Sequence, residues 1–185
     1  MTSDISIVLS PTPAPQSNNV QIKLGSAKEN NVIQINCTNQ NKDQSIFALA
    51  KAFLSISEMT HKKLQMLCYY AKAWYLAFYD RNLIDEQFEA WVNGAVQPAL
   101  YQKYKKYQYS EIPKLSDTGE IPEEFLSFAQ EVYRSYGHLT GYELEVVIHQ
   151  EDPWIEARGD CKPWECCHNY ISEESMKKYY RKMIA

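Results

Sequence analysis

The sequence lacks the short motifs by which many enzymes and nucleotide-binding proteins are recognised. It contains no Walker loop, no glycine pattern of a dinucleotide-binding fold, no GxSxG elbow and no HExxH motif. No stretch approaches the roughly 18 consecutive apolar residues that a membrane-spanning helix needs. The first residues lack a basic region followed by a long apolar run, so they do not predict a secretion signal. These absences lead us to expect no enzyme, no cofactor and no membrane partner.

A long run of positive charge is also missing. The 185 residues carry a formal net charge of -4, and Lys103, Lys105 and Lys106 form the densest basic cluster before the C-terminal tail. The tyrosines around this cluster are Tyr101, Tyr104, Tyr107 and Tyr109. Lysine mixed with tyrosine can contact nucleic acid by neutralising phosphates and stacking on bases. The whole chain, however, lacks the basic excess of such a surface. We therefore favour a helix whose tyrosines cover the core and whose lysines face water, and expect no nucleic-acid partner.

Cysteine is present in an odd number, and no CxxC pair occurs. The five are Cys37, Cys68, Cys161, Cys166 and Cys167. An odd count without a secretion signal favours a reduced, cytoplasmic protein. Residues 161–168 also contain His168, but zinc needs about four well-placed ligands and adjacent cysteines rarely serve one ion. We interpret this stretch as a loop with free, redox-sensitive thiols and expect no metal. A site built from its cysteines, with His149 as a further ligand, stays open as the alternative.

The chain divides into two parts of different character. Residues 1–42 hold three prolines, many Asn and Gln, and two short alternations of apolar residues around residues 20–24 and 32–35. Such alternation favours strands, and a lone hairpin is marginal in water. We therefore expect an N-terminal arm that is flexible or forms a small β-hairpin, with simple disorder of residues 1–19 as the preferred alternative.

Residues 43–185 have the pattern of a helical domain. Hydrophobic residues make up 45% of the chain, enough to close one core. Apolar residues recur at spacings of three and four, which predicts amphipathic helices with short connections. The fold class is therefore all-α, a compact bundle of about six helices. The expected helices lie at about 45–54, 60–78, 98–107, 122–136, 140–152 and 172–182.

Several local signals fix the ends and the placing of these helices. Thr60 can cap the second helix, which is apolar over more than half its circumference and should lie at the centre of the domain. Thr140 and Glu143 have the spacing of a capping box. Pro153 should block continuation of the helix that begins there.

Two polar clusters are candidate sites. Asn93-Gly94 is a strong turn dipeptide that could bind a ligand, although the simpler interpretation is that Trp91 fills the core and the glycine supplies unusual backbone angles. His149 stands near two carboxylates, a combination that can support acid–base chemistry. No partner motif for a nucleophile accompanies it. We therefore expect Trp154 to fold back onto the core and His149 to anchor the loop by hydrogen bonds.

Three stretches together resemble one family. Residues 63–76 read KLQMLCYYAKAWYL, residues 88–98 read FEAWVNGAVQP, and residues 149–154 read HQEDPW with Arg158 close behind. These stretches resemble the Panacea domain of the SocA-like antitoxin family, over about residues 44–184. Ala95 stands where the family usually has proline, so the turn is expected to be looser. The N-terminal arm and the cysteine-rich loop are outside the family pattern, so either could carry specificity.

The resemblance implies a function that composition and residue spacing alone do not indicate. It implies an antitoxin that neutralises the cognate protein toxin of a bacterial or phage toxin–antitoxin system by direct binding. The alternatives are an adaptor that delivers the toxin to a protease, a phage protein that counters host defence, and a metal or redox regulator. The residues that we predict to contact the partner are Asn93, Gly94, His149, Trp154, Arg158 and Trp164.

Overall fold

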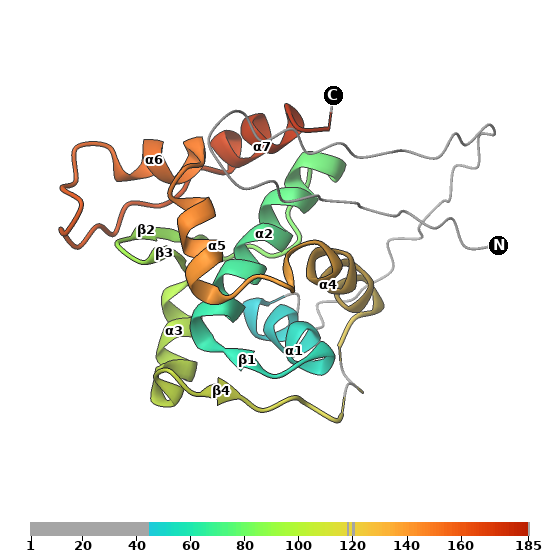
Figure 1. Ribbon diagram of the computed structural model, residues 1–185. Helices are drawn as coiled ribbons and strands as arrows, with labels where there is room; N and C mark the ends of the chain where they lie inside the picture. The colour runs from blue at the N-terminus through green and yellow to red at the C-terminus, as the bar shows by residue number, and fades with distance from the viewer. Residues whose placement is uncertain (1–44, 118, 120, 185) are drawn as a thin grey trace, which may run out of the picture.

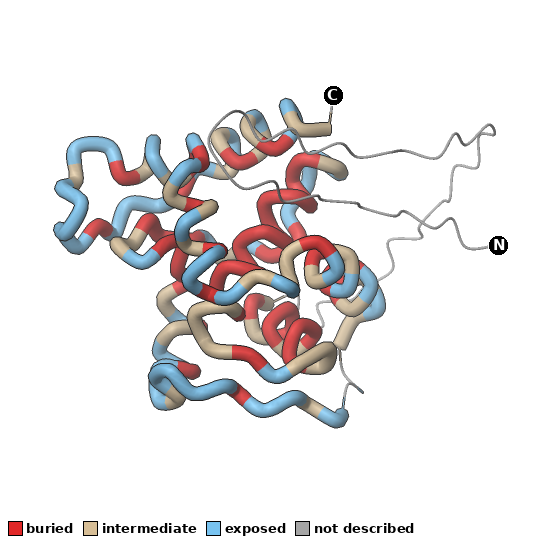
Figure 2. Tube along the Cα trace, viewed as in Figure 1, coloured by how far each residue is buried: buried red, intermediate tan, exposed pale blue. Residues whose placement is uncertain are grey.

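One helix runs through the middle of the others in the computed structural model, which describes residues 45–117, 119 and 121–184. This helix, α2 (His61–Tyr79), is buried continuously from Leu64 to Ala77. It contacts α1, α3, α4, α5 and α7 and the strands β1 and β3 (Figure 1). Figure 2 shows the buried residues concentrated along it. The predicted central place of this helix is confirmed, whereas the predicted arm of residues 1–42 lies outside the described residues.

The other elements surround α2 and are mostly helical. The remaining helices are α1 (Ile46–Ile56), α3 (Pro98–Tyr104), α4 (Glu123–Tyr136), α5 (Gly141–Ile148), α6 (Asp152–Arg158) and α7 (Glu173–Arg181), and a single 3-10 turn, η1 (Lys105–Tyr107), extends α3. Two small antiparallel sheets accompany them, one made of β1 (Met59–Thr60) and β4 (Glu111–Ile112), the other of β2 (Glu89–Trp91) and β3 (Gly94–Val96).

The predicted helix starts are confirmed by their hydrogen bonds. The Thr60 hydroxyl accepts from the backbone N–H of Lys63 at 3.3 Å, which satisfies one of the free donors at the start of α2. Thr140 and Glu143 form both halves of the predicted capping box at α5. Asp80 ends α2 in the left-handed conformation, with φ of 57°. These caps set the orientation of two helices whose first turns lie beside each other.

Three expectations about the fold need correction. The described residues contain seven α-helices rather than about six, because Pro153 does not simply end the preceding helix: α5 ends at Ile148, and Pro153 lies in the first turn of α6. Proline suits that position because the first N–H groups of a helix lack partners anyway. The two small sheets were not expected in an all-α bundle. Tyr109 was expected to cover the core and is instead 97% exposed.

The buried face of α2 also holds polar groups that find partners inside the fold. The Lys72 ammonium is fully buried, donates to the carbonyls of Ile84 and Glu86 at 3.1 and 2.8 Å, and pairs with Glu173 at 2.7 Å. Tyr70 of α2 and Tyr180 of α7 donate their hydroxyls to the buried Glu151 carboxyl at 3.1 and 2.6 Å. These contacts attach the chain after α2, the start of α6 and helix α7 to one axis.

The Glu151 carboxyl makes the stability of the fold depend on pH. Burial raises the pKa of this carboxyl to about 8, and the hydrogen bonds from the two tyrosines oppose the rise only in part. An unfolded glutamate releases its proton near a pKa of about 4.3. Between these two values the folded state binds more protons than the unfolded one, so the free energy of unfolding decreases as pH rises.

Glu151→Gln is therefore expected to remove part of this pH dependence, because the amide stays neutral and still reaches the two hydroxyls. Urea unfolding from about pH 5 to about pH 8 should show the wild type losing on the order of a few kcal/mol relative to the variant. Other titrating groups contribute equally to both proteins and cancel in the difference. Parallel stability curves for the two proteins would contradict the assignment.

Candidate binding site

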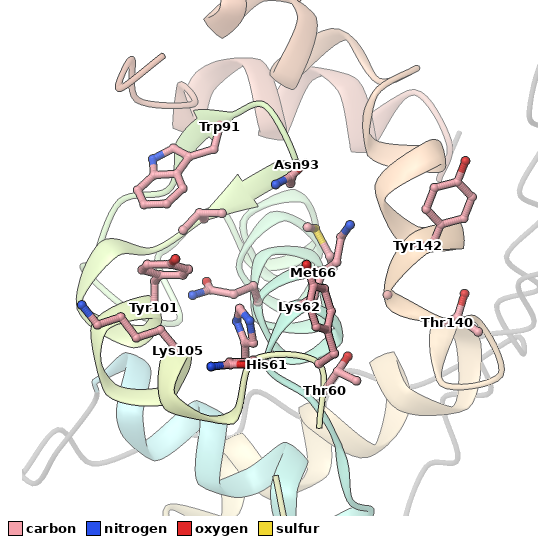
Figure 3. A pocket seen from close by; sticks show the side chains of 15 residues that line it. Thr60, His61, Lys62, Met66, Trp91, Asn93, Tyr101, Lys105, Thr140 and Tyr142 are labelled. Carbon is pink, nitrogen blue, oxygen red and sulfur yellow. The ribbon is translucent and has the colours of Figure 1, made fainter. Parts of the chain in front are cut away.

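A pocket of about 750 Å³ opens between the first turn of α2, the β2–β3 hairpin, the α3–η1 segment and the first turn of α5 (Figure 3). Its volume lies in the range of about 300–1,000 Å³ that is usual for binding sites in proteins. The lining residues are Thr60, His61, Lys62, Gln65, Met66, Trp91, Asn93, Val96, Tyr101, Lys105, Gln108, Tyr109, Thr140, Gly141 and Tyr142.

Aromatic rings form two facing sides of the pocket. Trp91 and Tyr101 lie on one side with their ring centroids 5.1 Å apart, and Tyr142 stands across from them on α5 (Figure 3). The Trp91 indole is fixed because its Nε1 donates to Glu89 Oε2 at 2.6 Å. Tyr142 is 70% exposed and so is free to contact a ligand or partner. The prediction that Trp91 fills the core is wrong, because its ring is half-buried and faces this pocket.

The charge of the lining has one sign. No aspartate or glutamate lines the pocket, although the chain holds 23 acidic residues, whereas Lys62 and Lys105 both line it. Lys62 forms a short ion pair with Glu145, which lies just outside the lining. Within the described part of the chain, Lys105 has no ion-pair partner. The pocket is therefore a locally positive place in a protein whose formal net charge is -4.

The floor of the pocket holds a histidine with an unused hydrogen-bonding atom. The His61 Nδ1 atom is buried and has no hydrogen-bond partner among the described residues. Burial, and then the neighbouring Lys62 charge, lower the pKa of this imidazole. A neutral imidazole offers one donor and one acceptor. The His61 ring lines the pocket without offering Nδ1 to it, because this atom is closed to solvent.

Two predicted site residues lie at the turn of the hairpin. Asn93 lines the pocket and is exposed. Gly94 is buried just behind it with φ of 111°, in a conformation that only glycine adopts easily, and a Cβ there would overlap the side chain of Met66. Gly94 therefore shapes the turn, whereas Asn93 presents a side chain at the surface.

Three other predicted residues pack together behind the hairpin rather than in the pocket. The His149 ring stacks on Trp154 with centroids 4.1 Å apart, and Arg158 lies 5.5 Å from the Trp154 ring on α6. Trp154 Nε1 donates to the Trp91 carbonyl at 3.2 Å. The predicted return of Trp154 onto the core is confirmed, since its partly buried ring packs there. This group holds the hairpin in place from the side opposite the pocket.

The acid–base cluster suggested by the sequence does not assemble. The Glu151 carboxyl faces the tyrosines of the core, and Asp152 lies 3.7 Å from Lys182. The His149 ring stacks on Trp154 instead. Burial lowers the pKa of the His149 imidazole, and the charge of Glu145 and a hydrogen bond with the Val92 backbone oppose this only in part. Neighbours in sequence thus serve three separate contacts. His149 bonds the backbone of Val92 in the hairpin turn rather than the loop after its own helix, and its buried Nε2 has no partner among the described residues.

The last predicted residue, Trp164, lies on the cysteine-rich loop and is 76% exposed. Arg158 binds this loop through the carbonyl of Glu165 at 2.9 Å and, by a short bond, through that of Lys162. The sulfur atoms of Cys161 and Cys167 lie 2.7 Å apart. Among the residues that the structure describes, no group of three His, Cys, Asp or Glu side chains is arranged to hold a metal ion.

Sequence reasoning missed most of the lining. Tyr142 could have been found, because it lies off the apolar stripe formed by Leu144 and Ile148 and so had to face outward. Lys105 was predicted to face water but not to line a pocket, and Lys62 gave no signal. These two lysines lie on elements far apart in the sequence, and the packing of α3 against α2 brings them to one pocket.

The comparison with known families identifies the central part of the chain. Residues 64–155 match the model of the family described as antitoxin SocA-like, Panacea domain, so this segment belongs to that family, as the resemblance indicated. The match runs from α2 into α6 and is shorter than the predicted span of 44–184. No curated protein and no solved structure matches the chain.

Across residues 45–117 and 121–184, none of the helices is both long enough and apolar enough to cross a lipid bilayer.

Truncation of the packed Trp154 and of the exposed Trp164 should change the free energy of unfolding by different amounts. Trp154→Ala removes a ring that packs between His149 and the core, and should destabilise the protein by roughly 2–4 kcal/mol. Trp164→Ala removes a mostly exposed ring and should change stability by no more than about 0.5 kcal/mol. Urea unfolding of both variants measures the difference. Equal losses would show that the described packing of Trp154 is wrong.

Proposed function

We propose that this protein is an antitoxin that neutralises a cognate protein toxin by binding it directly. The observation that carries the proposal is the match of residues 64–155 to the antitoxin SocA-like, Panacea family. The matched segment supplies the hairpin, α3, α5 and most of the pocket lining. Most of the described pocket therefore lies in the matched segment, and Thr60, His61 and Lys62 precede it.

The surface around the pocket has the chemistry of a protein interface. Tyrosine and tryptophan are enriched where proteins meet, because they combine a large apolar area with a polar tip. Tyr142 and Tyr109 stand exposed at the pocket, and Asn93 adds an amide. Exposed rings supported by a packed helical scaffold bind a partner with little loss of conformational entropy.

The predicted contact residues divide into two roles under this proposal. Asn93 and Trp164 are exposed and can touch the toxin themselves. His149, Trp154 and Arg158 act through the hairpin that they hold, and Gly94 acts through the shape of its turn. Truncation of the first group should weaken binding at constant stability, whereas changes in the second group should affect both.

Co-expression with the protein encoded by the neighbouring gene tests the proposal. The neighbouring protein alone should arrest growth, and this protein should restore it and elute with its partner as one complex in size-exclusion chromatography. Direct neutralisation predicts that rescue persists in a host that lacks its ATP-dependent cytoplasmic proteases.

The same experiment separates the alternatives. Rescue that disappears in the protease-deficient host, together with a shortened lifetime of the partner in the normal host, would indicate a proteolytic adaptor instead. Absence of both a complex and rescue would contradict an antitoxin role.

A further inference from the structure

The pocket concentrates positive charge. Lys105 is exposed on η1 with no ion-pair partner in the described segments. The first turns of α2 and α5 meet at the same place, and the partial positive charge of helix N-termini adds to that of the lysines. An anionic group is the natural counterpart of such a lining, which contains no carboxylate.

The aromatic part of the pocket is too open for a small ligand to cover. Tyr109 is 97% exposed and Tyr142 is 70% exposed, and both stand where the pocket meets the surface. A small anion in the floor would leave these rings in water. A polypeptide segment lying across the opening would cover both rings and place its side chains inside, which is the usual arrangement at protein interfaces.

We infer that this pocket binds an acidic segment of a partner protein that also carries an aromatic or large apolar side chain. The carboxylate lies near Lys105 and competes with Glu145 for Lys62, while the apolar side chain enters between Tyr142 and the Trp91–Tyr101 pair. This inference rests on the proposed function and names the chemistry of the partner that the site accepts.

The chain offers a matched pair of lysines for the test. Lys105 and Lys106 are neighbours on η1, both are exposed, and only Lys105 lines the pocket. Lys105→Glu and Lys106→Glu therefore change the net charge equally, and the contact that Lys106 loses is with the Tyr107 ring, 5.3 Å away and outside the pocket lining. A second pair lies on α5, where Tyr142 lines the pocket and the exposed Val146 does not.

The probe is a fluorescent random copolymer of glutamate and tyrosine, measured by anisotropy against the full chain. The wild type should bind it, more weakly at higher salt because part of the attraction is between exposed charges. Lys105→Glu should weaken binding about tenfold or more, since it places like charges opposite each other, whereas Lys106→Glu should stay within about twofold. Tyr142→Ser should weaken binding more than Val146→Ser, and circular dichroism verifies that all four variants fold.

Three results would overturn the inference: no binding of the copolymer by the wild type, equal loss in the two lysine variants, or displacement of the copolymer by ATP, which would mark a small-molecule site. Failure of the proposed function looks different. If the protein binds the copolymer through Lys105 but does not restore growth, the inference about the pocket stands and the antitoxin proposal fails. If it restores growth but does not bind the copolymer, the antitoxin proposal stands and the inference about the pocket fails.

Discussion

The burial of α2 on all sides is the constraint on which the rest of the structure depends. A helix that is hidden from Leu64 to Ala77 favours partners for its polar side chains, because an unpaired buried group costs on the order of 1–3 kcal/mol. The Tyr69 hydroxyl has no hydrogen-bond partner among the described residues, whereas Gln65 and Lys72 find theirs. Gln65 therefore exchanges two hydrogen bonds with the Gln97 backbone, accepting at 2.9 Å and donating at 3.2 Å. Lys72 does the same for the chain that follows α2 and for α7. These bonds fix the distances at which loops and helices pack against the axis.

The pocket is a geometric result of that arrangement. Gln97, held by Gln65, also caps α3, since its side chain accepts from the Leu100 N–H at 2.8 Å. This places Tyr101 and then Lys105 beside the half-buried first turn of α2. The buried helix α2 thus both stabilises the fold and positions the side chains that line the pocket.

Local signals in the sequence were enough for most helices and not enough for the site. The caps at Thr60 and Thr140 and the apolar stripes were predictable because they depend on residues within one or two turns. The β2–β3 hairpin was not, because strands of three residues are stabilised by distant groups such as the Arg158 guanidinium, which reaches the Ala90 carbonyl at 3.3 Å. The role of Pro153 is ambiguous locally, since proline both ends helices and begins them. Trp91 was misplaced for a related reason: its neighbours in space come from other elements.

The cysteine-rich loop is far from the hairpin in sequence but is hydrogen-bonded to β2, the strand that carries the pocket residue Trp91. Its last residues extend the hairpin as a further strand-like segment: Ala90 N–H donates to Asn169 at 2.9 Å, and Tyr170 forms a bridge with Glu89. The loop follows the end of the family match at residue 155, so it lies outside the matched segment. A change in this loop acts directly on β2, the strand that carries Trp91, and not directly on α2. Substitutions outside the family match can in this way reshape one side of the pocket without altering the central helix that the rest of the fold packs against.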